Sequence, residues 1–247
     1  MNPKHKQQIE DAEPFKNLKI SDWKVLEDIE NRSLCSNCNK SRKYFCYSCY
    51  IPVTALQGLI PRVKLPVKID IIKHAREIDG KSTAAHVAVL APDDVRVYTY
   101  PSIPNFEDTE KVVLVYPGKC ATSVKSLVEH FSRSQESGRD TNPPVSRAVF
   151  IDSTWNQSRG IYKDPRLRAL PCVVLGSRVS QFWRHQKGSP RWYLATVEAV
   201  HQFCAELGDA RYAGQCDDLL FFFCFMYAKI HSLYRHDDLH AYKRPLK

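Results

Sequence analysis

Short apolar segments alternate with amphipathic ones along most of this chain. Five apolar runs have the length of buried strands, namely 86–90, 95–100, 112–116, 148–152 and 172–175. Three of these runs are followed by segments of helical periodicity, at 124–131, 156–163 and 196–207. Strands that alternate with helices predict an α/β fold with an open parallel sheet.

Two segments depart from this alternation. Residues 219–234 are at first apolar nearly all round, which is typical of a helix buried in the core or in a subunit interface. Residues 132–146 contain a glycine, an asparagine and two prolines with few apolar side chains. This composition predicts a mobile insertion between two elements.

Prolines at 52, 61 and 66 predict a boundary near residue 60. We therefore expect a polar segment at 1–30, a small module at 31–60 and an α/β domain over 61–247.

The longest apolar run, 219–228, is too short to cross a bilayer, and residues 1–13 lack the apolar stretch of a secretory signal. We expect a reducing compartment, in which cysteines serve as thiols or metal ligands.

Four of the nine cysteines have the spacing of metal ligands. Cys35 and Cys38 form one Cys-x2-Cys pair, and Cys46 and Cys49 form a second. Four thiolates complete a tetrahedral zinc site and leave no open position for catalysis, so we interpret the site as structural. A redox dithiol is the alternative, although it needs only one pair. The other five cysteines show no such spacing and are typical of core positions.

The formal net charge is +9, from 36 Lys and Arg against 27 Asp and Glu. Between Arg159 and Arg191 eight basic residues accompany one acid, and Phe182 and Trp183 lie among them. Cations that contact phosphate beside rings that stack on bases are typical of RNA-binding surfaces. An ordinary solvated basic face is the alternative interpretation.

A run of polar and aromatic side chains, Asp-Ser-Thr-Trp-Asn-Gln at 152–157, ends one of the predicted strands. Ligands of open α/β sheets bind at the carboxyl ends of strands, so this position favours a functional site. A helix cap at Ser153 or Thr154 and a core position for Trp155 are the structural alternatives. We expect the loops 116–118, 152–155 and 176–196 to converge on a pocket at one edge of the sheet.

Several common catalytic motifs are absent from the sequence. It contains no Gly-x-x-x-x-Gly-Lys-Ser/Thr loop, no Gly-x-Gly-x-x-Gly turn and no His-Glu-x-x-His helix. Their absence counts against nucleotide hydrolysis, nicotinamide chemistry and zinc proteolysis. Composition and motifs thus predict an RNA-binding α/β domain with a candidate active site.

The string Asp-Ser-Thr-Trp at 152–155 resembles the Asp-x-Thr-Trp signature of the DTW-domain tRNA-uridine aminocarboxypropyltransferases. Segments 69–74, 115–118, 182–188 and 194–199 follow in that family's order. The resemblance spans about residues 35–227 and is strongest to the animal branch, which carries four-cysteine knuckles and Ser at the second signature position. His74-Ala75 stands where the wider family tends to have His-Pro.

The resemblance implies transfer of the 3-amino-3-carboxypropyl (acp) group of S-adenosylmethionine to N3 of a tRNA uridine, with release of 5′-methylthioadenosine. The expected target is a D-loop uridine, at position twenty in the animal branch. A knotted, SPOUT-like α/β fold and a location in the nucleus, or in the cytoplasm as well, are also implied. The alternatives are a SPOUT-like tRNA methyltransferase and a noncatalytic, zinc-containing RNA-binding adapter.

Residue roles follow as hypotheses for this reaction. Asp152, as the only acid in the signature, would remove or orient the N3 proton. Trp155 would stack on a base or face the sulfonium, and Thr154 would fix a polar edge. The residues expected to contact the cofactor are Tyr116, Pro117, Gly118, Leu194, Ala195, Thr196 and Glu198. Glu198 would bind the amino group of the cofactor. Those expected to hold RNA, or in the case of the basic ones the cofactor carboxylate, are Asn156, Arg184, His185 and Lys187.

Overall fold

The computed structural model describes residues 13–106, 109–136, 145–186 and 188–246. Its centre is a six-stranded sheet in the order β6-β5-β9-β7-β10-β8, with every neighbouring pair parallel. The strands are β5 (Lys68–Lys73), β6 (Val95–Thr99), β7 (Val112–Val115), β8 (Thr122–Ser123), β9 (Arg147–Asp152) and β10 (Cys172–Val174). The predicted α/β class with an open parallel sheet is therefore confirmed.

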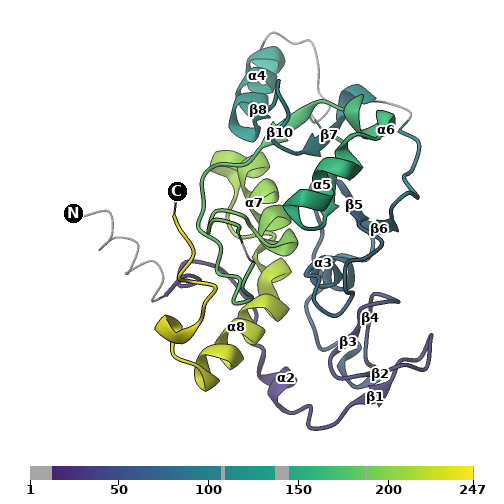
Figure 1. The fold of residues 1–247 in the computed structure, drawn as a ribbon, viewed down its shortest axis with the longest axis vertical. Helices are drawn as coiled ribbons and strands as arrows, with labels where there is room; N and C mark the ends of the chain where they lie inside the picture. Colours follow the sequence, from purple (N-terminus) through teal and green to yellow (C-terminus); the bar gives the residue numbers. More distant parts are fainter. Residues whose placement is uncertain (1–12, 107–108, 137–144, 187, 247) are drawn as a thin grey trace.

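Helices cover both faces of this sheet (Figure 1). The buried apolar residues form two clusters. Alternate residues of β5 contribute to different clusters: Ile69 and Ile71 belong to the larger one, and Ile72 belongs to the smaller one. The larger cluster includes residues of α2 (Lys24–Glu27), α3 (Ala84–Leu90), α4 (Val124–Glu136), α7 (Thr196–Gly208) and α8 (Phe221–Leu233). The smaller cluster includes residues of α5 (Trp155–Tyr162) and α6 (Pro165–Arg168). No helix in the described ranges is long and apolar enough to cross a membrane.

Four of the five apolar runs form strands, but the expected strand at 86–90 is wrong, because these residues belong to α3. Every residue of α3 is buried, and apart from His86 the helix consists of Ala, Val and Leu, so its sequence lacks an amphipathic period. The expected insertion at 132–146 is in part helical, since α4 (Val124–Glu136) continues through its first residues. Residues 137–144 lie outside the described ranges.

Strand β10 lies between β7 and β8, which are consecutive in the sequence. The connection between those two strands, residues 116–121, passes close to β10 at Gly118. A Cβ atom at Gly118 would lie 2.8 Å from Sγ of Cys172 in β10 and 3.0 Å from the hydroxyl of Tyr162 in α5. Glycine is needed here because the space for a side chain is already filled.

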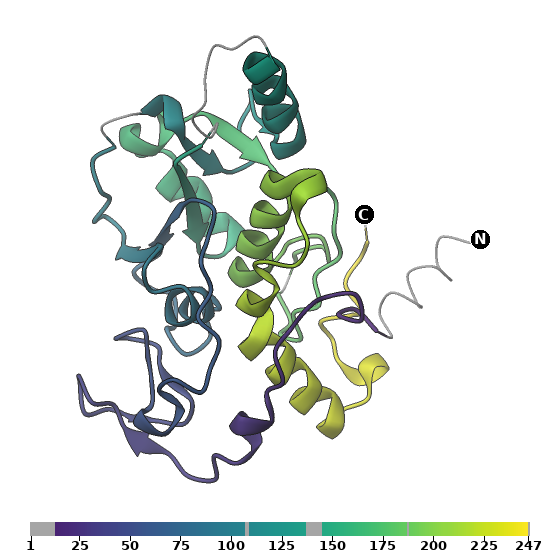
Figure 2. The same ribbon diagram turned by 180° about the vertical axis from the view of Figure 1, so that it is seen from behind.

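The cysteine-rich module lies at the end of the molecule opposite α4 (Figures 1 and 2). It consists of two small antiparallel pairs, β1 (Ser33–Leu34) with β2 (Ser41–Arg42) and β3 (Phe45–Cys46) with β4 (Ile51–Pro52). The ring of Phe45 packs 5.4 Å from that of His86 in α3 and 4.6 Å from that of Phe222 in α8. The module therefore shares its core with the sheet domain.

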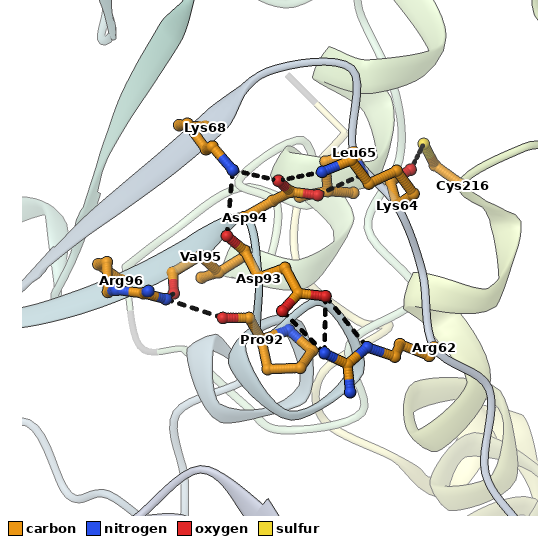
Figure 3. Close-up of polar contacts among 10 residues, drawn as sticks. All are labelled: Arg62, Lys64, Leu65, Lys68, Pro92, Asp93, Asp94, Val95, Arg96 and Cys216. Carbon is orange, nitrogen blue, oxygen red and sulfur yellow. Dashed lines mark hydrogen bonds and ion pairs between the residues drawn. The ribbon is translucent and has the colours of Figure 1, made fainter. Parts of the chain in front are cut away.

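An ion-pair network fastens the amino ends of β5 and β6, away from the carboxyl edge (Figure 3). The buried carboxylate of Asp94 accepts hydrogen bonds from Lys64 at 2.9 Å, from Lys68 at 2.7 Å and from the backbone amide of Leu65 at 2.9 Å. Burial raises the pKa of Asp94, but these hydrogen bonds outweigh it and lower the pKa to about 2. The network holds the segment that leads into β5.

Candidate ligand pocket and metal centre

A pocket of about 550 Å³ lies at the carboxyl edge of the sheet, beyond the ends of β7, β9 and β10. Its wall includes Tyr116 and Pro117 after β7, Ser153 after β9, and parts of the long segment that follows β10. The three loops predicted to converge do meet here. The volume falls within the range of small-molecule sites, about 300 to 1,000 Å³.

Aromatic rings dominate one part of the pocket wall. The Trp155 ring lies 4.3 Å from that of Tyr193 and 6.3 Å from that of Tyr116, measured between centroids. Tyr116 in turn stacks on Tyr162 at 4.3 Å, which fixes its orientation. Trp192 also lines the pocket and keeps 39% of its surface exposed. Such rings can hold a planar heterocycle by stacking and a cation by their faces.

Asp152 lies at the carboxyl end of β9 with only 6% of its surface exposed. Its carboxylate accepts hydrogen bonds from Ser82 Oγ at 2.7 Å and from Thr196 Oγ1 at 2.5 Å. Burial raises the pKa of Asp152, although both hydrogen bonds act in the opposite direction. Because Thr196 lines the pocket, Asp152 lies directly behind the pocket wall.

Thr154 lies outside the pocket wall, although a contact within the site was expected, and Asn156, which was expected to hold RNA, is exposed on α5. Thr154 is the N-cap of α5 and forms a capping box with Gln157, whose side chain accepts from the Thr154 amide at 3.1 Å. Both Thr154 and Asn156 are exposed, and neither lines the pocket. The helix-cap interpretation therefore describes Thr154, and the functional signal of the string rests on Asp152 and Trp155.

The expected contact of Glu198 with the cofactor does not agree with its surroundings. Glu198 is fully buried, and its carboxylate accepts from Ser180 Oγ at 2.6 Å, from the Gln181 amide at 2.7 Å and from the Ala195 amide at 2.8 Å. It thus ties the long segment after β10 to the start of α7. Ala195 and Gly118 also lie outside the pocket wall, whereas Leu194 and Thr196 form part of it.

Two of the basic residues predicted to hold RNA phosphate or the cofactor carboxylate, Arg184 and His185, line different pockets. Arg184 lines a second pocket of about 160 Å³, between the cysteine-rich module and α3. His185 lines a third pocket, of about 480 Å³, formed with the C-terminal residues. Lys187 lies outside the described ranges. Neither Arg184 nor His185 lines the pocket that contains Trp155.

Among the residues of the main pocket that sequence reasoning did not single out are three large side chains, those of Arg178, Trp192 and Tyr193. All three lie in the segment between β10 and α7, which has no regular secondary structure and no periodic pattern. Arg178 was counted within the basic segment, but no local feature distinguished it from its neighbours. Their only sequence signal was membership of a loop that follows a strand.

The four predicted metal ligands come together in the cysteine-rich module. The Sγ atoms of Cys35, Cys38, Cys46 and Cys49 all lie within 4.8 Å of one another, and those of Cys38 and Cys46 are 3.6 Å apart. Zinc bound at about 2.3 Å by four thiolates requires sulfur pairs about 3.8 Å apart. The cluster therefore fits a closed tetrahedral site for Zn²⁺.

Arg42, which lies between the two cysteine pairs in the sequence, belongs to this centre. It is 5% exposed and donates from Nε to Cys46 Sγ at 3.4 Å. Its guanidinium also stacks 3.8 Å above the Tyr47 ring and donates to Ser48 Oγ at 3.3 Å. A cation beside a thiolate offsets the negative charge that four sulfurs bring to one ion.

These features define an α/β protein with a ligand pocket at the carboxyl edge of a parallel sheet and a separate four-thiolate metal centre. The sequence profile of the DTW domain matches residues 43–231, so the signature, the pocket and part of the metal centre lie within one family match. The chain belongs to the DTW-domain family.

Comparison with individual proteins agrees with this assignment. A protein of Xenopus tropicalis is 42% identical over 88% of this chain and 86% of its own length. Proteins of Mus musculus and Homo sapiens are 40% and 39% identical, over 92% and 90% of this chain and 87% and 85% of their own lengths. All three are named tRNA-uridine aminocarboxypropyltransferase 1.

Among solved structures, a match is found to the SAM-dependent rRNA:acp-transferase Tsr3 from Vulcanisaeta distributa. It is 14% identical, covers 70% of this chain and 77% of that chain, and has a TM-score of 0.36. This likeness is too weak to support conclusions about the present fold or site.

Proposed function

We propose that this protein transfers the acp group of S-adenosylmethionine to N3 of a uridine in tRNA. The observation that carries the proposal is the pocket at the carboxyl edge of the sheet, where Trp155 of the signature packs against Tyr193. Relatives that are 39 to 42% identical over most of this chain carry the name of this activity, which supports the proposal.

The pocket suits a ligand with a sulfonium cation and an adenine ring. The rings of Tyr116, Trp155 and Tyr193 supply faces for both groups. When bound, S-adenosylmethionine supplies a carbon that is electrophilic because it is attached to positively charged sulfur.

In this reaction Asp152 would be the proton acceptor for N3. Each carboxylate oxygen accepts one hydrogen bond from a hydroxyl and has a further lone pair. As the N3 proton moves to Asp152, N3 bonds to the γ-carbon, and the electrons of the breaking carbon–sulfur bond remain on sulfur in neutral 5′-methylthioadenosine. Burial raises the pKa of Asp152 and so makes its carboxylate a better base than an exposed aspartate.

The tRNA target belongs to the same proposal. N3 lies on the pairing edge of uracil, so the base must be unpaired and out of its stack, which favours a loop such as the D-loop, at position twenty. The basic segment between β9 and α7 would contact phosphates, and tRNA affinity should then fall steeply with salt. We also propose that the protein acts in the nucleus.

A knotted, SPOUT-like threading is part of the proposal. It is supported by the insertion of β10 between β7 and β8 and by the passage of residues 116–121 next to β10 at Gly118. An arrangement of this kind would build the pocket from loops on both sides of β10 and hold them rigidly.

Mass spectrometry of both products tests the proposed reaction. Purified protein is incubated with unmodified tRNA and S-adenosylmethionine, with Asp152→Ala as the control. The expected products are an acp-uridine in the tRNA and 5′-methylthioadenosine, both absent with the variant. Methylated RNA with S-adenosylhomocysteine would instead indicate a methyltransferase, and tight tRNA binding without turnover would indicate an adapter.

A further inference from the structure

Arg178 is the only charged side chain among the described residues that line the main pocket. The rest of the wall consists of aromatic and aliphatic side chains, small residues and hydroxyls. Arg178 is half-buried and makes no ion pair with a carboxylate in the described part of the chain. The pocket therefore presents one positive charge to its ligand.

A buried chain of hydrogen bonds supports this guanidinium from behind. Arg178 Nη1 lies 3.3 Å from Nδ1 of His201, whose Nε2 lies 2.9 Å from Oδ1 of Asp217. His201 is 3% exposed and Asp217 is 2% exposed. Asp217 is itself held by the hydroxyl of Tyr212 at 2.6 Å and by the backbone amide of Lys19 at 2.7 Å.

The donor pattern of this chain determines the state of His201. A guanidinium only donates, so Nδ1 of His201 must be an unprotonated acceptor, and the ring proton is on Nε2, where it donates to Asp217. The imidazole is therefore neutral and orients Arg178 without neutralising it. Burial lowers the pKa of His201, the hydrogen bond with Asp217 acts in the opposite direction, and the charge of Arg178 lowers the pKa further. The net lowering agrees with a neutral ring.

We propose that Arg178 binds the α-carboxylate of the amino-acid part of S-adenosylmethionine and that His201 and Asp217 position it. The proposal rests on the proposed function, and it replaces Arg184, His185 and Lys187 as candidates for the carboxylate. A guanidinium suits this partner because it can donate two parallel hydrogen bonds to one carboxylate. The contact would hold the acp group that is transferred. It would also favour S-adenosylmethionine over related ligands that lack the carboxylate.

Binding of three related ligands tests the proposal without reference to turnover. S-adenosylmethionine, decarboxylated S-adenosylmethionine and 5′-methylthioadenosine are titrated calorimetrically into the wild type and into Arg178→Met. The wild type should bind S-adenosylmethionine about 10- to 100-fold more tightly than its decarboxylated form, as expected for a charge-assisted contact. In Arg178→Met this ratio should fall to about 1, while the affinity for 5′-methylthioadenosine is unchanged.

Three further variants and one control make the result specific. Arg178→Lys keeps the charge without the planar fork and should retain an intermediate ratio. His201→Leu should lower the ratio, and His201→Gln, whose amide oxygen can accept from Arg178, should restore part of it. Arg168→Met, at an exposed arginine of the same basic segment, should match the wild type.

Other outcomes would overturn the proposal or the function on which it rests. An unchanged ratio in folded Arg178→Met, or an equal loss for all three ligands, would exclude Arg178 as the carboxylate partner while leaving the proposed function standing. Wild-type protein that is folded but binds no S-adenosylmethionine would overturn the proposed function itself, and the assignment of Arg178 with it.

Discussion

Two hydroxyl groups hold the carboxylate of Asp152 in place at the end of β9. This arrangement is compatible with a base and with a residue that only positions Ser82 and Thr196. Replacement of Asp152 by Asn distinguishes the two roles. An amide can still form hydrogen bonds with Ser82 and Thr196, but it does not take up a proton at neutral pH.

The first prediction separates these roles. Asp152→Asn should lower turnover at least about 100-fold while leaving affinity for S-adenosylmethionine nearly unchanged, because proton transfer is lost and the local hydrogen bonds can be kept. Single-turnover rates and calorimetric binding measure the two effects. Asp209→Asn, at an exposed position with φ of 45° that Asn also tolerates, is the matched control. Near-normal turnover in Asp152→Asn would exclude the base.

The pH dependence of the wild type provides a second residue-scale prediction. Since burial raises the pKa of Asp152, its carboxylate becomes protonated at a higher pH than that of an exposed aspartate. Single-turnover rates should therefore rise with pH through this raised pKa and level off above it. The acidic limb should be missing from the residual activity of Asp152→Asn, and persistence of the same limb would assign it to another group.

At the scale of elements, the passage of residues 116–121 next to β10 depends on Gly118. Gly118→Ala would place a methyl group 2.8 Å from Cys172 Sγ and 3.2 Å from its Cβ, so we expect a loss of about 1 to 3 kcal/mol in the free energy of unfolding. Gly160→Ala is the control, because its Cβ would meet nothing within 4 Å and it lies inside α5, where Ala gains about 0.5 to 1 kcal/mol. Urea denaturation measures both. Equal effects would argue against the close packing at Gly118.

The network at the amino ends of β5 and β6 makes stability depend on acid pH. Because the folded-state pKa of Asp94 is about 2, below its ordinary value, its contribution is present above about pH 4 and is lost as the pH falls toward 2. Asp94→Asn should cost about 1 to 2 kcal/mol at neutral pH, and the difference from the wild type should shrink between pH 5 and pH 2.5. Urea denaturation across this range measures it.

Asp93→Asn is the matched control for this network, since Asp93 is exposed and pairs with the exposed Arg62 (Figure 3). It should change stability little at any pH. A pH-independent loss in Asp94→Asn would mean that the carboxylate acts through packing rather than through its charge.

At the scale of the whole molecule, the metal centre and the sheet domain share one core. Phe45, between the two cysteine pairs, packs on α3 and α8. Loss of the metal should therefore destabilise the sheet domain as well as the cysteine-rich module. We expect about one zinc per chain, and a melting temperature about 10 °C lower after chelation or in Cys49→Ser. Elemental analysis and thermal unfolding measure these quantities. Cys120→Ser, at an exposed cysteine outside the cluster, should behave as the wild type.

Much of the architecture could be read from local patterns. The Cys-x2-Cys pairs predicted the metal cluster, and the polar string at the end of an apolar strand located Trp155 in the pocket wall and Asp152 directly behind it. The run at 86–90 was assigned to the wrong element because burial removes polar residues from strands and helices alike. The apolar runs did not predict strand β5, because Asp70 interrupts its apolar sequence. In the structure Asp70 pairs with Arg147 at 2.8 Å.

The sequence by itself therefore determined the α/β class, the cysteine cluster and the family signature, because each depends on residues close together in the chain. Only the tertiary structure decided which distant side chains meet: Arg178 with His201 and Asp217, and Asp152 with Ser82 and Thr196. It also assigned Glu198 and Arg42 to supporting positions. Such contacts depend on how strands and loops are packed, and a loop without periodicity does not reveal its partners in the sequence.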